Sequence, residues 1–135
     1  MSNLQQEFYN KNRKEKKNII LCFDNEKIIT ILSKLLTPVA NIISTDNNAC
    51  SWTYEEYTQF KKINIDVVFT GVLMDGVDGF LIMKDIMSFN KEQVVCSISK
   101  KEENELFEIM FPKTHHLKLP IDLNNFFKIC IDLDI

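Results

Sequence analysis

Four short apolar runs rich in β-branched residues, and a weaker fifth strand signal at HHLKL, alternate along the chain with segments in which apolar residues recur at helical spacing. Runs of the first kind are typical of strands, and segments of the second kind are typical of amphipathic helices. The expected strands are 18–23, 41–45, 65–70, 94–99 and 115–119. The expected helices are 26–36, a segment through Trp52, Tyr57 and Phe60, then 80–89, 102–111 and 122–133. Five strand–helix repeats with short links predict an α/β fold, in which helices cover both faces of a parallel sheet.

Two of the expected strands show how the core should form. The run 65–70 is apolar almost throughout, as in a central parallel strand that is covered on both faces. Cys22 and Cys96 lie inside apolar runs, where a thiol behaves as a small hydrophobic group, so we expect both in the core. On the helix 102–111 we expect Leu106, Phe107 and Met110 to face inwards.

Composition limits the functions that are open to the chain. With 135 residues, 45% hydrophobic and 26% charged, it has the size and balance of one globular domain. The 16 basic and 19 acidic side chains give a net charge of -3, which provides no broad positive field for nucleic acid or anionic lipid. We therefore expect neither nucleic-acid nor membrane partners.

The cellular location is inferred from the motifs that the sequence lacks. No apolar stretch approaches the roughly 20 residues that cross a bilayer, and the polar start MSNLQQEFYN has no secretory signal. The four cysteines, Cys22, Cys50, Cys96 and Cys130, form no CxxC pair, so no zinc or redox motif is indicated. A stand-alone cytoplasmic protein with reduced thiols is expected.

The first 17 residues differ from the rest of the chain. Five basic side chains surround Glu15 between Lys11 and Lys17. A terminal charge run is usually solvated, so residues 1–17 are expected to form a basic and polar extension that is unpacked or adds an extra helix turn, and 18–135 the folded domain. A docking arm that contacts phosphate is the alternative.

The segment DVVFTGVLMDGVDGF resembles the third strand and following loop of the response-regulator receiver family. In that family an apolar run ends in the phospho-acceptor aspartate, followed by a methionine and a proline, and then an aspartate and a glycine. Met74, Gly76, Asp78 and Gly79 match, and Asp66 matches the acid that opens the strand. The resemblance spans roughly 18–133 and implies a three-layer (βα)5 receiver or flavodoxin-like fold with strand order 2-1-3-4-5.

The functional positions of the family are altered. Gly71 stands at the acceptor position and Asp75 at the proline; glycine offers neither a nucleophile nor a metal ligand. Asp24 and Asn25 match the acidic pair at the first strand, where Asn25 brings no charge. Asp24 alone is a weak candidate for Mg²⁺, so we expect weak or absent binding and no cofactor.

The remaining positions follow strands four and five. Ser99 replaces the switch threonine or serine conservatively, and Leu119 replaces the lysine before Pro120. Lys118 is not expected to substitute for that lysine, because neighbouring strand residues point to opposite faces. His116 aligns with the aromatic switch position and is interpreted as a partly exposed strand residue.

The resemblance thus implies a degenerate receiver, or pseudo-receiver, in two-component or phosphorelay signalling, which binds a partner without phosphorylation and is not an enzyme. The partner would be a histidine kinase, another regulator or a second copy, bound through the face of helix 102–111, strand 115–119 and helix 122–133.

Three alternatives start from the same strand ends. Asp24 or Asp75 could accept phosphoryl in place of Gly71, or both could be solvated turn or cap residues, as expected for Asp78 before its helix. A haloacid-dehalogenase-like phosphohydrolase would use Asp24 as nucleophile, Glu26 as general acid and Thr70 as phosphate contact. A flavodoxin-like cofactor site is disfavoured, because FDNEK lacks the hydroxyl and glycine residues of a phosphate loop.

Overall fold

The computed structural model describes residues 3–45, 50–74 and 77–135. The helices are α1 (Asn3–Asn10), α2 (Glu26–Leu36), α3 (Cys50–Glu55), the π-helical continuation η2 (Glu56–Phe60), α4 (Gly79–Phe89), α5 (Lys101–Met110) and α6 (Leu123–Asp132). The strands are β1 (Lys17–Cys22), β2 (Ala40–Thr45), β3 (Val67–Thr70), β4 (Leu73–Met74), β5 (Val77–Asp78), β6 (Val95–Ser99) and β7 (His115–Lys118).

Five strands form one parallel sheet in the order β2-β1-β3-β6-β7. Counting only these strands, the order is 2-1-3-4-5, so the predicted topology is confirmed. Cys22 lies opposite Thr70 and Ser99 lies opposite Lys118, so the carboxyl ends of these strands meet at one edge. Between β3 and α4, the two short strands β4 and β5 pair antiparallel, outside the main sheet.

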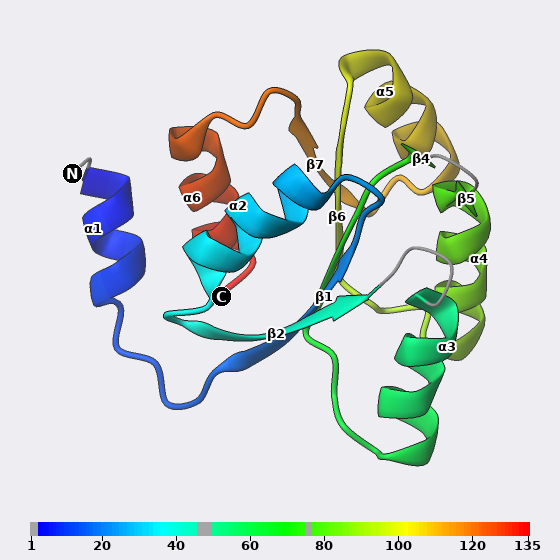
Figure 1. The fold of residues 1–135 in the computed structure, drawn as a ribbon, viewed down its shortest axis with the longest axis horizontal. Helices are drawn as coiled ribbons and strands as arrows, with labels where there is room; N and C mark the ends of the chain where they lie inside the picture. Colours follow the sequence, from blue (N-terminus) through cyan, green and yellow to red (C-terminus); the bar gives the residue numbers. More distant parts are fainter. Residues whose placement is uncertain (1–2, 46–49, 75–76) are drawn as a thin grey trace.

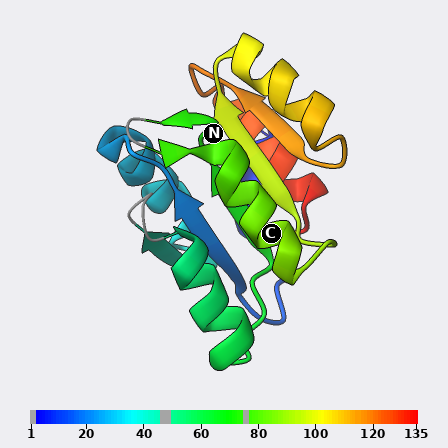
Figure 2. The same ribbon diagram turned by 90° about the vertical axis from the view of Figure 1, so that its right-hand side faces the viewer.

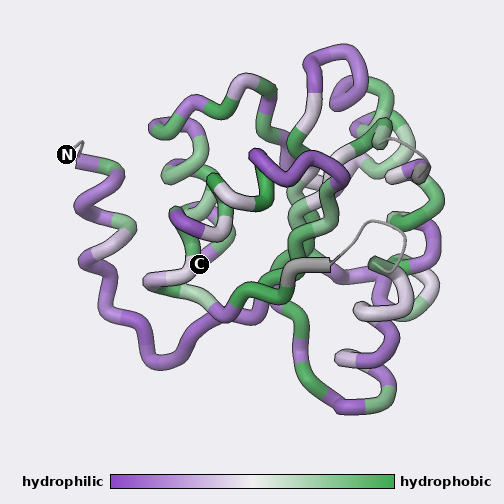
Figure 3. Tube along the Cα trace, in the orientation of Figure 1, coloured by the Kyte–Doolittle hydropathy of each residue, from purple (hydrophilic) through white to green (hydrophobic). Residues whose placement is uncertain are grey.

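Helices cover both faces of the sheet in three layers (Figure 1). Helices α1, α2 and α6 lie on one side, and α3, α4 and α5 lie on the other, an arrangement that Figure 2 shows from the side of the second group. Side chains alternate along β1: Ile19 and Leu21 enter the core under α2 and α6, whereas Ile20 and Cys22 enter the core under α3 and α4. The strands therefore read as continuous apolar runs, and the apolar part of the trace follows them (Figure 3).

All four cysteines are buried free thiols, so the prediction for Cys22 and Cys96 is confirmed. Burial raises the pKa of the Cys96 thiol to about 12, which keeps it protonated and unreactive at neutral pH. Within the described part of the chain, no helix combines the length and the apolar character that crossing a membrane requires.

The expectation of an unpacked N-terminal extension is wrong. Helix α1 packs beside α6, and the ring of Phe8 is 0% exposed, 5.4 Å from the ring of Phe127. The Tyr9 hydroxyl donates to the Leu35 carbonyl at 2.7 Å, which ties α1 to the end of α2 as well. A few apolar side chains within a polar stretch are thus sufficient to dock this helix onto the core.

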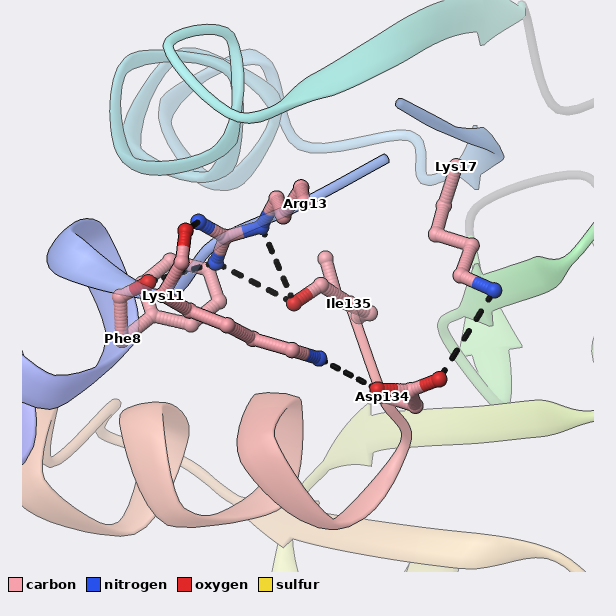
Figure 4. A network of polar contacts seen from close by, with 6 residues as sticks. All are labelled: Phe8, Lys11, Arg13, Lys17, Asp134 and Ile135. Atoms are coloured by element: carbon pink, nitrogen blue, oxygen red, sulfur yellow. Dashed lines mark hydrogen bonds and ion pairs between the residues drawn. The ribbon is translucent and has the colours of Figure 1, made fainter. Parts of the chain in front are cut away.

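The basic run also contacts the folded domain (Figure 4). Arg13 donates from Nε and Nη2 to the Ile135 carbonyl at 3.2 and 3.1 Å, and its guanidinium lies 4.8 Å from the centre of the Phe8 ring. Lys11 and Lys17 both pair with Asp134, and the hydrogen bond from Lys11 is the main reason that the pKa of Asp134 is lowered. The interpretation as a solvated tail therefore fails for three of the five basic residues.

Candidate functional site

The carboxyl ends of β1, β3, β6 and β7 meet where an open α/β sheet usually binds its ligands. Asp24 and Asn25 follow β1 and are both exposed. The Asn25 side chain accepts a hydrogen bond from the Lys27 amide at 2.9 Å and is the N-cap of α2. Asn25 therefore has a structural role, which an aspartate could also fill.

Gly71 follows β3 directly and is buried, and its amide donates to the Cys22 carbonyl at 3.1 Å. A Cβ atom added to Gly71 would lie 3.0 Å from both Cγ and Sδ of Met74 and 3.6 Å from the Phe23 ring. The space that a side chain at this position would enter is therefore crowded by the Met74 thioether, and the Phe23 ring borders it at ordinary contact distance. An acid here would require Met74 to move and would face an apolar surface.

The start of α4 lies against the backbone of Gly71 and Val72. Asp78 accepts a hydrogen bond from the Phe80 amide at 2.8 Å, so the prediction that Asp78 caps this helix is confirmed. A Cβ atom on Gly79 would lie 2.5 Å from the Gly71 carbonyl oxygen, so only glycine allows α4 to begin this close to the loop. Asp75, the alternative acceptor, lies outside the described residues.

Two side chains that the phosphohydrolase hypothesis requires, Thr70 and Glu26, have structural roles in the fold. The buried Thr70 hydroxyl donates to the Gly71 carbonyl at 2.8 Å, so its proton is used within the backbone. Glu26 is exposed in the first turn of α2, where a carboxylate stabilises the helix terminus. Neither observation indicates a phosphate site.

Ser99 ends β6 and is almost fully buried. Its hydroxyl donates to the Glu103 carboxylate in the first turns of α5, and its carbonyl accepts from the Leu119 amide at 2.9 Å. The hydroxyl is therefore engaged with α5.

Leu119 lies just after β7, with a cis peptide bond to Pro120. Its side chain packs against the core under α2 and α6, whereas the side chain of Lys118 is exposed. The position that matches the family's lysine thus holds a packed aliphatic side chain.

A buried polar network beneath α5 was not predicted. Ser97 Oγ donates to Asn104 Oδ1 at 2.8 Å and lies 2.6 Å from His116 Nδ1. Asn104 Nδ2 donates to the Ser99 and Leu117 carbonyls at 3.2 and 3.1 Å. These contacts join β6, β7 and α5, so His116 is a network member as well as the partly exposed strand residue that was expected.

Protonation of His116 at low pH is expected to destabilise this network. Burial lowers the pKa of His116, opposed by Glu108 and assisted by His115. The folded protein therefore favours the neutral imidazole. A sequence signal existed: Ser97, Ser99 and His116 are polar residues that strand alternation places on one face.

In residues 3–45, 50–74 and 77–135, no group of three or more His, Cys, Asp and Glu side chains is placed to hold a metal ion. Of the matched positions at the strand ends, only Asp24 brings a carboxylate, whereas Mg²⁺ binding requires several hard oxygen ligands.

Comparison with solved structures identifies the fold. The response regulator receiver protein from Sinorhizobium medicae matches with a TM-score of 0.72 at 15% identity, covering 90% of this chain and 96% of that one. A chain of the CheX–CheY–BeF3–Mg²⁺ complex from Borrelia burgdorferi matches with a TM-score of 0.71 at 21% identity, covering 88% and 90%. The fold is that of a receiver domain.

A third match, the CheY-like receiver domain protein from Methanospirillum hungatei, has a TM-score of 0.70 at 11% identity, covering 89% of this chain and 95% of that one. No protein-family model and no curated protein matches the chain by sequence. At these identities the likeness concerns the receiver fold, and the function has to be inferred from the site.

Proposed function

We propose that this chain is a pseudo-receiver, which works in two-component or phosphorelay signalling by binding a protein partner and takes up no phosphoryl group. One observation carries the proposal. At the end of β3, where the family places its acceptor, the chain has Gly71, with the Met74 thioether close by and the Phe23 ring in ordinary contact. A carboxylate is required there to attack phosphorus and to bind the metal.

Two further positions support the same conclusion. Asn25 is uncharged and is used as a helix cap, and Leu119, at the position of the family's lysine, is partly buried against the core. In the family, the three altered positions accept the phosphoryl group, coordinate the metal ion and neutralise the phosphoryl charge. All three losses therefore point to the same missing chemistry. Without that ligand, the balance between conformations is set by the sequence or by a binding partner.

The partner surface that we propose is the α5–β7–α6 face. Leu106, Ile109 and Met110 are 51%, 77% and 56% exposed at helical spacing on α5, and Leu123 on α6 is 50% exposed. An exposed apolar stripe of this kind is typical of an interaction surface. The partner that we propose is a histidine kinase, another regulator or a second copy of the chain. We place this interaction in the cytoplasm and propose no nucleic-acid or membrane partner.

Titration with Mg²⁺, followed through backbone amide NMR signals, tests this proposal. We expect the amides of Asp24, Gly71 and Ser99 to remain unchanged at millimolar Mg²⁺. The double variant Asn25→Asp with Gly71→Asp is the matched control, because it restores two acids beside Asp24 and needs only the flexible Met74 side chain to move. A saturable submillimolar response of the unmodified chain would contradict the proposal.

The alternative in which another acid accepts phosphoryl draws support from Asp24, which is exposed at the end of β1. Asp75 is the second candidate. Under this alternative the chain would gain a phosphoryl group that peptide mapping places on one of these two residues, and replacement of that residue by asparagine would abolish the gain.

A further inference from the structure

Two hollows lie at the opposite edge of the sheet from the strand tips. One, of about 280 Å³, is lined by residues 87 and 91–94 and by the segment 110–115, where α5 ends and β7 begins. The other, of about 350 Å³, is lined by parts of 54–65 and by Phe89, Asn90 and Gln93. Gln93 lines both hollows, so they are neighbours on the two sides of the α4–β6 connection. We call the pair the basal groove.

The walls of the first hollow are apolar and adaptable. The first hollow contains the side chains of Met87, Met110 and Phe111. Val94 and Met110 are 37% and 56% exposed, so part of this apolar surface is open to solvent. Methionine side chains can rearrange around different partners, and such surfaces suit the binding of apolar side chains.

The floor of the groove is firmly held. The buried Gln93 side chain accepts a hydrogen bond from the Tyr54 hydroxyl at 2.7 Å and donates to the Val94 carbonyl at 3.1 Å. A ligand would therefore meet a fixed floor with movable methionine walls.

The rim of the groove is positive although the whole chain has a net charge of -3. Lys62, Lys91 and Lys113 line the two hollows and are exposed, whereas among the described lining residues the one carboxylate is that of Glu92. The ion pairs found within the described part of the chain do not involve these three lysines. A partner that carries carboxylates beside apolar side chains would complement both features.

We propose that the basal groove binds an acidic, amphipathic peptide segment of a partner protein. Apolar side chains of the segment would fill the hollows, and its carboxylates would lie against Lys91 and Lys113. The proposal deepens the protein-binding function proposed above and rests on it, but it uses a surface distinct from both the strand tips and the centre of the α5 stripe.

Selection from a display library of short random peptides on the full chain tests the proposal, because the selected sequences report the chemistry that the surface prefers. We expect enrichment of peptides that combine Asp or Glu with large apolar residues. In fluorescence anisotropy, Lys91→Glu with Lys113→Glu should weaken the selected peptide about tenfold or more. The matched control is Lys34→Glu with Lys128→Glu, which reverses two exposed charges on the other layer and should change little.

An apolar pair separates this groove from the α5–β7–α6 face. Met87→Gln alters the α4 side of the first hollow, whereas Ile109→Gln alters an exposed residue of the α5 stripe that lines neither hollow. Weakening by Met87→Gln alone supports the groove. Equal or greater weakening by Ile109→Gln would move the peptide to the α5 face and overturn this inference, while leaving the pseudo-receiver proposal intact.

The remaining outcomes also overturn the inference. Absence of enrichment, enrichment of basic peptides, or peptide binding that survives the double charge reversal would each do so. If the chain self-associates in sedimentation analysis and the double charge reversal abolishes this association, the groove would be assigned to a second copy of the chain. Binding to phosphatidylserine vesicles that the same reversal abolishes would assign it to a membrane surface. A response in the Mg²⁺ titration would remove the pseudo-receiver proposal without changing any of these results.

Discussion

At the scale of single residues, the side chains around the strand tips are engaged in holding the fold. Asn25 and Asp78 accept backbone hydrogen bonds at the starts of α2 and α4, and the Ser99 hydroxyl is bonded to Glu103 in α5. Polar residues at these positions thus have a structural reason to be there, independent of any phosphoryl chemistry. Their effect on stability can be measured separately from their effect on ligand binding.

Replacement of Asn25 tests the capping role. Asn25→Ala removes the acceptor for the Lys27 amide and is expected to lower the free energy of unfolding by about 1 kcal/mol, whereas Asn25→Asp retains an acceptor and should be close to neutral. Urea denaturation of both variants measures the difference. If Ala and Asp lowered stability equally, the cap would not be the reason for the effect.

Single residues also show where sequence reasoning succeeds. The cap at Asp78 could be predicted because an aspartate just before a helix has a local, short-range role. The network of Ser97, Asn104 and His116 could not be predicted in the same way, because it joins side chains that are up to 19 positions apart in the chain. The hydrogen-bond partner of a buried serine depends on packing that the sequence alone does not specify.

At the scale of elements, α5 differs most from what was expected. Phe107 is buried as predicted, but Leu106 and Met110 are exposed, and Asn104 takes the inward position instead. The reason lies in the sheet: under this helix, β6 presents Ser97 and β7 presents His116, so a polar side chain is favoured on the facing surface. The surface of α5 that was expected in the core is therefore an exposed apolar surface.

The same contact predicts a pH dependence. Because burial lowers the pKa of His116, the unfolded chain binds a proton there that the folded chain resists, and the free energy of unfolding should decrease as the pH falls below about 6.5, the ordinary value for histidine. Urea denaturation between neutral pH and about pH 5 measures this slope. His116→Gln should flatten this slope, whereas His115→Gln removes only the charge that assists the lowering and should reduce the slope slightly. Equal slopes in all three proteins would exclude His116 as the origin.

Boundaries of the elements were predicted closely where the period of apolar residues was clear. The helix 26–36 is observed as α2 over the same residues, and the five main strands differ by two residues or fewer at each end. The segment through Trp52 and Phe60 forms α3 and then a π-helical turn, η2, which apolar spacing does not distinguish from a regular helix.

At the scale of the whole molecule, the N-terminal helix closes one side of the fold. Phe8 fills a place in the core beside Phe127, and Arg13 and Lys11 connect the following segment to residues 134–135. The segment that follows α1 and residues 134–135 are thus held together beside α6 (Figure 4). The exposed apolar stripe on α5 lies in the opposite helical layer (Figure 1).

Replacement of Phe8 tests this closure. Phe8→Ala removes a fully buried ring and is expected to lower the free energy of unfolding by about 3–5 kcal/mol. Phe60→Ala removes a ring that is 76% exposed and should have little effect. Urea denaturation compares the two. Similar small losses in both variants would mean that α1 does not contribute to the cooperative core.

The whole fold was predictable because five strand–helix repeats restrict the topology strongly. The docking of α1 was not, because Leu4, Phe8 and Tyr9 are too few and too mixed with polar residues to form a recognisable apolar face. Their burial depends on a groove made by α2 and α6, which exists only after the rest of the chain has folded.

We propose that the molecule has no group able to accept phosphoryl where the receiver fold places one. Incubation of the unmodified chain with acetyl phosphate and Mg²⁺, followed by intact-mass spectrometry beside a phosphorylatable receiver, tests this directly. We predict that the mass stays that of the free chain, because Gly71 and its neighbours Met74 and Phe23 offer no nucleophile. A stable gain of one phosphoryl group, at Asp24, Asp75 or any other acid, would contradict the account.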